Sequence, residues 1–467
     1  MSWTETSAGH WERPLGLIEK VPLVVSAQSL RPGRENWYET MIAKVSFDPI
    51  LGSPADALRN GWKQMRYAFP EIAASVRNGI YVYEVPTTPA AVEDWLAETC
   101  VVVQENLTAD EFMQSLPPSK FMTLHFLPHT SEVIMSSSHF RLDGPAFMVL
   151  FNYLTHAMAK PEPYEFGTEP ANLAPSFEVS ASVPQAPYTP EIEAAAMSRL
   201  MAFSTQLPPV TLKPTYSLHS PAGVSGRATL TISTSESKAI ITACKAHALT
   251  VNMAQHSALV SAVVALEGPT PAGVVERAFS AIAAFGLRKY CIATTTRTVP
   301  SGGAAATIAS SGNVYPIMVT DGSFHSHATQ LKEIYAQGFD AFLPSMSCAQ
   351  EKMLPMLEKP MPAEMPGQTD PVMSGLGVVD RMIASEVRNE TGEIVLRVED
   401  FWVGMEILQR APQLFFWTWK GQLVWTVCYN EAYWSKADMN ILLEETKRQL
   451  IQGLGIVDLG EDKKPTT

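Results

Sequence analysis

A histidine and an aspartate four positions apart are the residues of this chain best suited to acid–base chemistry. His139 and Asp143 follow the β-branched segment Glu132–Met135 and precede apolar residues that recur at helical spacing. An imidazole with an unperturbed pKa of about 6.5 suits a general base near neutral pH. Gly144, directly after Asp143, lets other groups approach closely. We therefore predict that His139 is catalytic at a strand-to-helix junction; the alternative is a core histidine that is hydrogen-bonded at a strand end.

The order His-x-x-x-Asp-Gly resembles the motif of the CoA-dependent acyltransferases of the BAHD type and of their fungal relatives that acylate secondary metabolites. It is similar, more remotely, to peptide-synthetase condensation domains and to chloramphenicol acetyltransferase. The resemblance implies that His139 is the general base and that Asp143 has an architectural role, holding the His139 loop. It also implies an ion pair between Asp143 and an arginine of the second domain, for which the matching residue is Arg288. The alternative is that both are unrelated surface residues.

A segment near the C-terminus matches a second motif of the same family. The segment Asp400-Phe401-Trp402-Val403-Gly404 resembles the family sequence Asp-Phe-Gly-Trp-Gly. It departs from the family at the third and fourth positions. The resemblance therefore implies that Trp402 supplies the family's indole N–H from one position earlier, or that this role is absent.

A third match lies between these two motifs. Gly312 and Asn313 resemble a Gly-Asn segment that follows the arginine strand in the family. The resemblance implies that they lie beside the CoA arm. The three matches follow the family order and extend from about residue 40 to residue 455, whereas each of the last two alone is typical of an ordinary turn.

Composition limits the classes of partner. The chain has 467 residues, of which 46 % are hydrophobic and 17 % charged, and its formal net charge is −13. Because no dense run of lysine and arginine is present, we expect neither a nucleic acid nor a membrane as partner. No secretory signal and no apolar segment of roughly 18 residues is visible. The five cysteines are scattered and no metal-ligand spacing occurs, so we expect a cytoplasmic protein without a metal site.

The order of the expected elements predicts an α+β protein with two domains. We place the N-terminal domain at residues 1–195, and it ends in a Pro-rich crossover linker at about 160–222. The C-terminal domain then covers residues 223–467. The family resemblance implies that both domains are chloramphenicol-acetyltransferase-like, with a central tunnel between them.

Together, the motifs and the resemblance predict an O-acyltransferase. It would move an acyl group from acyl-CoA to a hydroxyl, less favourably an amine, of a small and apolar natural product. Acyl-CoA would be a co-substrate, with no permanently bound cofactor, and the family expectation is a monomer. A carrier protein acting in trans is a second possible donor. Two other hypotheses stay open: a donor-free cyclisation, isomerisation or hydrolysis in the same fold, and a non-catalytic binding protein.

Overall fold

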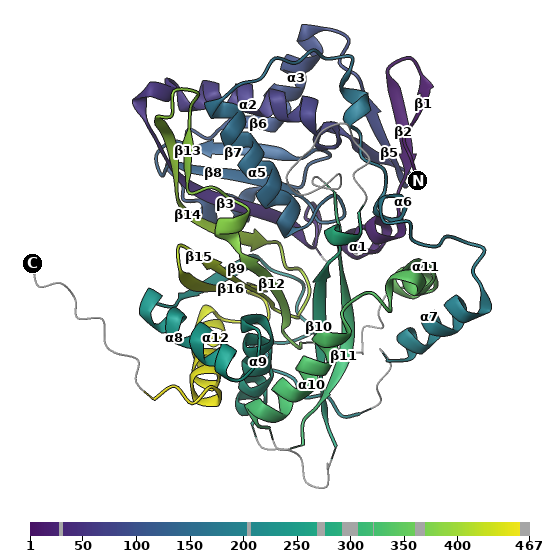
Figure 1. Cartoon of the computed structure of the whole chain (residues 1–467), viewed down its shortest axis with the longest axis vertical. Helices are drawn as coiled ribbons and strands as arrows, with labels where there is room; N and C mark the ends of the chain where they lie inside the picture. The colour runs from purple at the N-terminus through teal and green to yellow at the C-terminus, as the bar shows by residue number, and fades with distance from the viewer. Residues whose placement is uncertain are drawn as a thin grey trace, which may run out of the picture.

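The chain folds into two halves, each built on a β-sheet with helices packed against it (Figure 1). This computed structural model describes residues 1–27, 31–202, 207–268, 276–291, 307–320, 322–359 and 369–457. Each half has its own large cluster of buried apolar side chains. Within the described ranges, no single helix is long and apolar enough for a membrane span, although two consecutive helices at 234–246 and 251–267, bent by 98°, meet the test together by length and composition.

The N-terminal half contains a six-stranded sheet in the order β13-β14-β3-β8-β7-β6, antiparallel except between β6 and β7. β7 and β8 form an antiparallel hairpin directly before His139. The strands are β3 (Tyr38–Phe47), β6 (Cys100–Val102), β7 (Thr123–Leu127), β8 (Glu132–Ser138), β13 (Glu386–Arg388) and β14 (Ile394–Met405). The main helices of this half are α2 (Pro54–Ala68), α3 (Pro89–Thr99), α4 (Ala109–Ser115) and α5 (Gly144–Ala159).

Two of these helices cover the sheet because of signals in the sequence. Ser53 caps α2 through its hydroxyl, which accepts a hydrogen bond from the N–H of Asp56, and Pro54 occupies the first helical position. α5 is apolar over most of its length because its side chains lie in the core, with Leu150 and Leu154 fully buried. Its N-terminus is therefore held firmly at the end of β8.

The C-terminal half has a four-stranded sheet in the order β12-β15-β16-β9 and a separate antiparallel ladder of β10 and β11. The strands are β9 (Ser225–Thr231), β10 (Ala278–Gly286), β11 (Ser310–Met318), β12 (Val372–Val378), β15 (Gln413–Trp419) and β16 (Gln422–Asn430). Its helices are α8 (Thr234–Ala246), α9 (Val251–Glu267), α10 (Phe324–Gln337) and α12 (Lys436–Gly453).

The boundary expected at residue 222 does not separate the two sheets. β13 and β14 come from the predicted C-terminal domain but extend the N-terminal sheet, where β14 pairs with β3 from Leu396 opposite Phe47 to Met405 opposite Glu39. A boundary drawn from composition cannot detect such an exchange, because strand pairing joins segments far apart in the sequence.

The described parts of the Pro-rich segment, 160–202 and 207–222, are more ordered than an extended linker. Phe177 and Val183 are buried in a small cluster of apolar side chains, and the carboxylate of Glu178 accepts a hydrogen bond from the N–H of Ile18 (2.9 Å). Two α-helices of this segment, α6 and α7, lie near α1 and α11, respectively (Figure 1). These helices are α6 (Phe177–Ser180), α7 (Pro190–Ala202), α1 (Leu17–Ala27) and α11 (Met346–Leu357). A second antiparallel sheet of the N-terminal half contains β1 (Thr4–Ser7), β2 (His10–Pro14), β5 (Ile80–Glu84) and β4 (Ser75–Arg77).

Candidate active site

His139 lies directly after β8 and turns its Nδ1 atom toward two acceptors. Nδ1 is 3.1 Å from Oε1 of Glu39 and 3.2 Å from the carbonyl oxygen of Leu142. A carboxylate and a carbonyl can only accept hydrogen bonds, so Nδ1 carries the hydrogen and Nε2 keeps its lone pair in the neutral ring. Nε2 is therefore the atom of His139 that can accept a proton.

The charges around His139 favour its protonated form. Burial alone would lower the pKa of the imidazole, but the carboxylate of Glu39 and, more weakly, that of Asp143 raise the pKa above its ordinary value. The side chain of His139 is 21 % exposed, so another molecule can reach it. The site thus has a basic and accessible histidine.

Glu39 was not among the residues predicted from the sequence. It belongs to β3, and its backbone lies opposite Ser137 of β8 on one side and Met405 of β14 on the other. The sequence signal for Glu39 is its place beside the apolar residues of β3. An ionisable residue in such a place is rarely buried without a partner. The partner itself depends on the pairing of β3 with β8.

Asp143 caps α5 and binds Arg288. One carboxylate oxygen accepts from the N–H of Ala146 (3.0 Å) and the other from the N–H of Ala309 (3.0 Å). The guanidinium of Arg288 donates to both oxygens, at 3.0 and 2.6 Å, and also to the carbonyl of Thr307. Burial alone would raise the pKa of Asp143, but Arg288 and the two N–H donors hold the pKa below its usual range. Asp143 therefore connects the His139 loop to the C-terminal half, as an architectural residue would.

Gly144 marks a close contact between the two halves. A Cβ atom at this position would lie 2.9 Å from Cδ2 of Leu376, a residue of β12. The need for glycine here is therefore steric: Gly144 is the first residue of α5, and its φ is not positive.

Trp37 is a second neighbour of His139 that the sequence did not indicate. Its ring meets the imidazole edge-on, with centroids 5.9 Å apart and planes at 82°. Its φ is +64°, a left-handed conformation that is strained for an aromatic residue. The backbone N–H of Trp37 donates to the carbonyl of Glu406 (2.8 Å), which holds this conformation.

The segment at 400–404 does not join His139. In the pairing of β14 with β3, Trp402 lies opposite Ile42 and packs with the cluster on that face of the sheet, whereas Glu39 points to the other face. The indole N–H of Trp402 is buried and has no hydrogen-bond partner among the described residues. Trp402 therefore lies on the face of the sheet opposite to Glu39, which favours the alternative that the family's indole role is absent here.

The other motif residues of this segment have structural surroundings. Asp400 is exposed and accepts a hydrogen bond from the N–H of Phe401 (2.8 Å), while Phe401 is buried against Trp417. A Cβ on Gly404 would lie 2.1 Å from the terminal methyl of Met113 in α4. The motif residues thus shape β14 and its contact with α4.

Gly312 and Asn313 lie on β11, opposite Ala284 and Ala283 of β10. Gly312 is exposed and comes three positions after Ala309, whose N–H binds Asp143. The side chain of Asn313 lies outside the described part of the chain. Their predicted place beside a CoA arm stays a prediction.

No family model matches this chain, but several known proteins are similar to it over nearly its whole length. It is 29 % identical over 474 residues to acetyltransferase pigO of Monascus ruber, covering 98 % of this chain and 99 % of pigO. It is 26 % identical over 470 residues to O-acetyltransferase pigM of the same organism, covering 98 % of this chain and 88 % of pigM. The chain resembles fungal secondary-metabolite acyltransferases.

A solved structure supports the same fold. The TRI3 trichothecene 15-O-acetyltransferase from Fusarium sporotrichioides matches with a TM-score of 0.81 at 17 % identity, covering 96 % of both chains. At that identity the match concerns the fold alone. The predicted α+β fold of the chloramphenicol-acetyltransferase type is confirmed.

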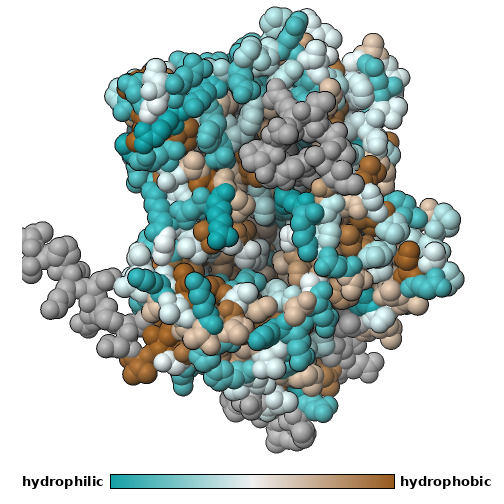
Figure 2. Space-filling view, in the orientation of Figure 1, coloured by the Kyte–Doolittle hydropathy of each residue, from teal (hydrophilic) through white to brown (hydrophobic). Residues whose placement is uncertain are grey.

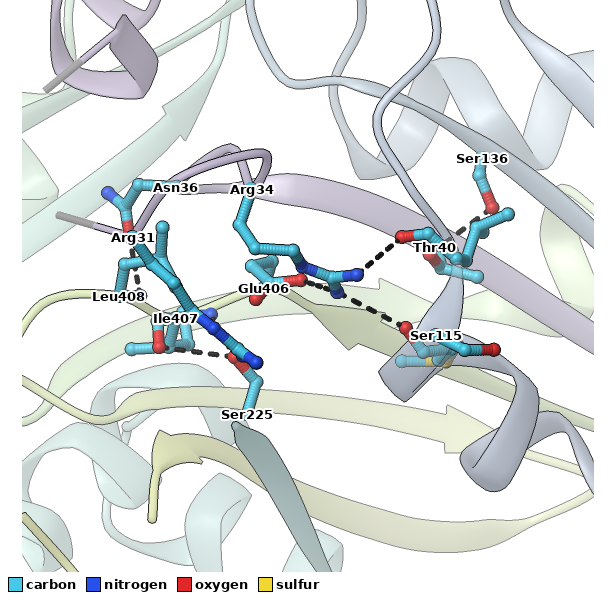
Figure 3. Close-up of polar contacts among 12 residues, drawn as sticks. Arg31, Arg34, Asn36, Thr40, Ser115, Ser136, Ser225, Glu406, Ile407 and Leu408 are labelled. Carbon is cyan, nitrogen blue, oxygen red and sulfur yellow. Dashed lines mark hydrogen bonds and ion pairs between the residues drawn. The ribbon is translucent and has the colours of Figure 1, made fainter. Parts of the chain in front are cut away.

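A group of hydrogen bonds lies between the two halves, on the face of β3 opposite to Glu39 (Figure 3). The N–H of Leu408 donates to the amide oxygen of Asn36 (2.8 Å), and the hydroxyl of Ser225 donates to the carbonyl of Ile407 (3.1 Å). Beside these contacts lies a cavity of about 140 Å³. Its lining includes Arg34, Tyr38, Thr40, Arg227 and Glu406.

This cavity does not include His139 among its lining residues. In the space-filling view, the face shown in Figure 1 is hollowed between the two halves (Figure 2). The predicted central tunnel, leading between the two halves to the imidazole, stays a prediction. Within the described ranges, no group of three or more histidine, cysteine, aspartate and glutamate side chains is arranged to hold a metal ion.

Proposed function

We propose that this chain transfers an acyl group from acyl-CoA to a hydroxyl, less favourably an amine, of a small natural product. The observation that carries the proposal is the orientation of His139: its Nδ1–H donates to the carbonyl of Leu142 and lies beside the carboxylate of Glu39, so Nε2 is available as a base. The similarity to acetyltransferases over nearly the whole chain supports acyl transfer as the reaction class. His139 is the general base of the proposed reaction.

The reaction follows from the chemistry of the imidazole. Nε2 of His139 removes the proton of the acceptor hydroxyl while its oxygen attacks the thioester carbonyl, and a tetrahedral oxyanion forms. The oxyanion then collapses, the carbon–sulfur bond breaks, and the imidazolium gives its proton to the departing thiolate. The products are the ester and free CoA. No acyl-enzyme forms, so the donor and acceptor must be bound at the same time.

Asp143 and Arg288 act in this proposal as positioning residues. Their ion pair fixes the start of α5 and the loop that carries His139. The burial of the pair keeps this loop in one arrangement, because separating either charge from its partner would leave it uncompensated. We place the CoA arm near Gly312 on β11, on the basis of the family resemblance. We also propose that the protein acts as a monomer in the cytoplasm on an apolar acceptor. It would need neither a metal nor a permanently bound cofactor.

Binding of the donor is the first test. Calorimetry with acetyl-CoA and with a longer acyl-CoA is expected to give micromolar binding to the wild-type chain. Release of free CoA should then depend on an added alcohol and should fall roughly 10²- to 10⁴-fold in His139→Ala, since general-base catalysis contributes about that much. His156→Ala, which removes an exposed histidine of α5, is the matched control and should keep its activity.

Three outcomes separate the alternatives. A folded protein that binds no acyl-CoA would overturn the proposal for a free CoA donor, and an acyl carrier protein would be tested next. Turnover of an intermediate in the absence of any acyl donor would support the donor-free reaction. Donor binding with no turnover above background, in both the wild type and His139→Ala, would contradict a catalytic role of this histidine and support the binding-protein hypothesis.

A further inference from the structure

We infer that Glu39 is a positioning residue for the proposed general base, and that its carboxylate stabilises the imidazolium of His139 during acyl transfer. The inference rests on the proposed function for its catalytic part. Its structural part, a Glu39–His139 dyad assembled from β3 and the turn directly after β8, is independent of the substrate. No motif of the sequence includes Glu39.

The position of Glu39 is fixed on both sides. β3 runs between β8 and β14, and Glu39 lies opposite Ser137 and Met405 in the two ladders. His139 follows Ser137 by only two residues, so the same ladder that places Glu39 also places the imidazole. A site at the end of a strand ladder holds its geometry better than one on a mobile loop.

The carboxylate of Glu39 depends on His139 for its counter-charge. Glu39 is 8 % exposed, and its Oε2 has no hydrogen-bond partner among the described residues. Among the described residues, no lysine or arginine forms an ion pair with Glu39. Its one ion-pair contact is with Nδ1 of His139. A buried carboxylate without a cation is costly. The pair is therefore most stable when the imidazole is protonated.

The other charged groups near His139 have partners of their own. Asp143, at the start of α5, is neutralised by Arg288. Glu35, which precedes β3, accepts a hydrogen bond from the hydroxyl of Ser138 (3.0 Å), and burial raises its pKa. Glu39 is thus the carboxylate whose charge acts most directly on the imidazole.

Two acceptors at Nδ1 have separable effects. The carbonyl of Leu142 remains in any variant of Glu39, so it still holds the hydrogen on Nδ1. Glu39 adds a full negative charge, which favours the imidazolium that forms when Nε2 takes a proton. Removing that charge should change the proton affinity of His139 while the tautomer stays the same.

The test is a titration of the full chain with isotopically labelled histidine, followed by NMR. The chain has ten histidines, and His139→Ala identifies the signal of His139. In Glu39→Gln, which keeps the shape of the side chain, the pKa of His139 is expected to fall with the Nδ1–H tautomer unchanged. Glu39→Asp keeps the charge and should have a pKa above that of Glu39→Gln.

A matched control separates this effect from a general loss of buried charge. Glu132→Gln alters another buried carboxylate of the same sheet, at the opposite end of β8, and should leave the His139 titration unchanged. In a working assay, Glu39→Gln should lose roughly 10- to 100-fold in kcat, with the acid limb of the pH profile shifted in the same direction as the NMR titration.

The outcomes are distinct from those of the proposed function. An unchanged pKa of His139 in a folded Glu39→Gln overturns the inference, and Glu39→Asp supplies the comparison if the Gln variant does not fold. If the pKa of His139 falls in Glu39→Gln but the wild type transfers no acyl group, the dyad is supported. Only the proposed acyltransferase reaction is then contradicted.

Discussion

Asp143 and Arg288 are 145 positions apart in the sequence and form a two-point ion pair inside the protein. Asp143 stands at the N-terminus of α5, and Arg288 follows β10 in the C-terminal half. The pair therefore ties the loop of the candidate base to the opposite half of the molecule, and its loss should affect stability as well as activity.

Arg288→Ala is expected to destabilise the chain by about 3–5 kcal/mol, because it leaves a buried carboxylate without its cation. Urea unfolding of the variant and the wild type measures this difference. Arg448→Ala is the control, since Arg448 pairs with Glu445 at the surface and should contribute less than about 1 kcal/mol. A loss at Arg288 as small as that at Arg448 would contradict the buried role of the pair.

The pH dependence of the reaction should reflect the raised pKa of His139. Below that pKa the imidazole is protonated and cannot accept a proton, so kcat/KM should rise with pH and its midpoint should lie above about 6.5. The same shift stabilises the folded chain at low pH, and this contribution is lost as the pH rises through the folded-state pKa. A rate profile with its midpoint below the ordinary histidine value would refute the charge environment described for the site.

Gly144→Ala should force Leu376 away from the start of α5, since the added Cβ would lie 2.9 Å from Cδ2. We expect a loss of about 1–3 kcal/mol in the free energy of unfolding, typical of overpacking. Leu376→Val removes part of the clashing side chain, so the cost of Gly144→Ala should be smaller in that background. Chemical unfolding of the two single variants and the double variant gives the coupling. Strictly additive effects would show that the two residues do not meet.

Trp402→Phe tests the departure from the family motif. Because Trp402 lies on the face of the sheet opposite to Glu39, the variant should retain activity within about threefold of the wild type. The initial rate of CoA release, with His139→Ala in the same assay, measures this. A loss of about 100-fold or more would instead indicate that the indole N–H stabilises the oxyanion.

Much of the candidate site could be predicted from the sequence because it follows local rules. His139, Asp143 and Gly144 are neighbours in the chain, and the apolar pattern around them places them between β8 and α5. The ion pair with Arg288 was implied by a family resemblance, since no local rule connects residues so far apart. Glu39 and Trp37 were missed for the same reason.

The same distinction between local and long-range interactions applies to the fold. The sequence by itself determined the α+β class and the helix that follows His139, because hydrophobic periodicity and helix caps act over a few residues. Only the tertiary structure decided that β14 joins the N-terminal sheet and that Trp402 points away from the imidazole. It also decided that a carboxylate of β3 meets Nδ1 of His139. These relationships depend on strand register, and register is set by pairing between distant segments that no local pattern of the chain records.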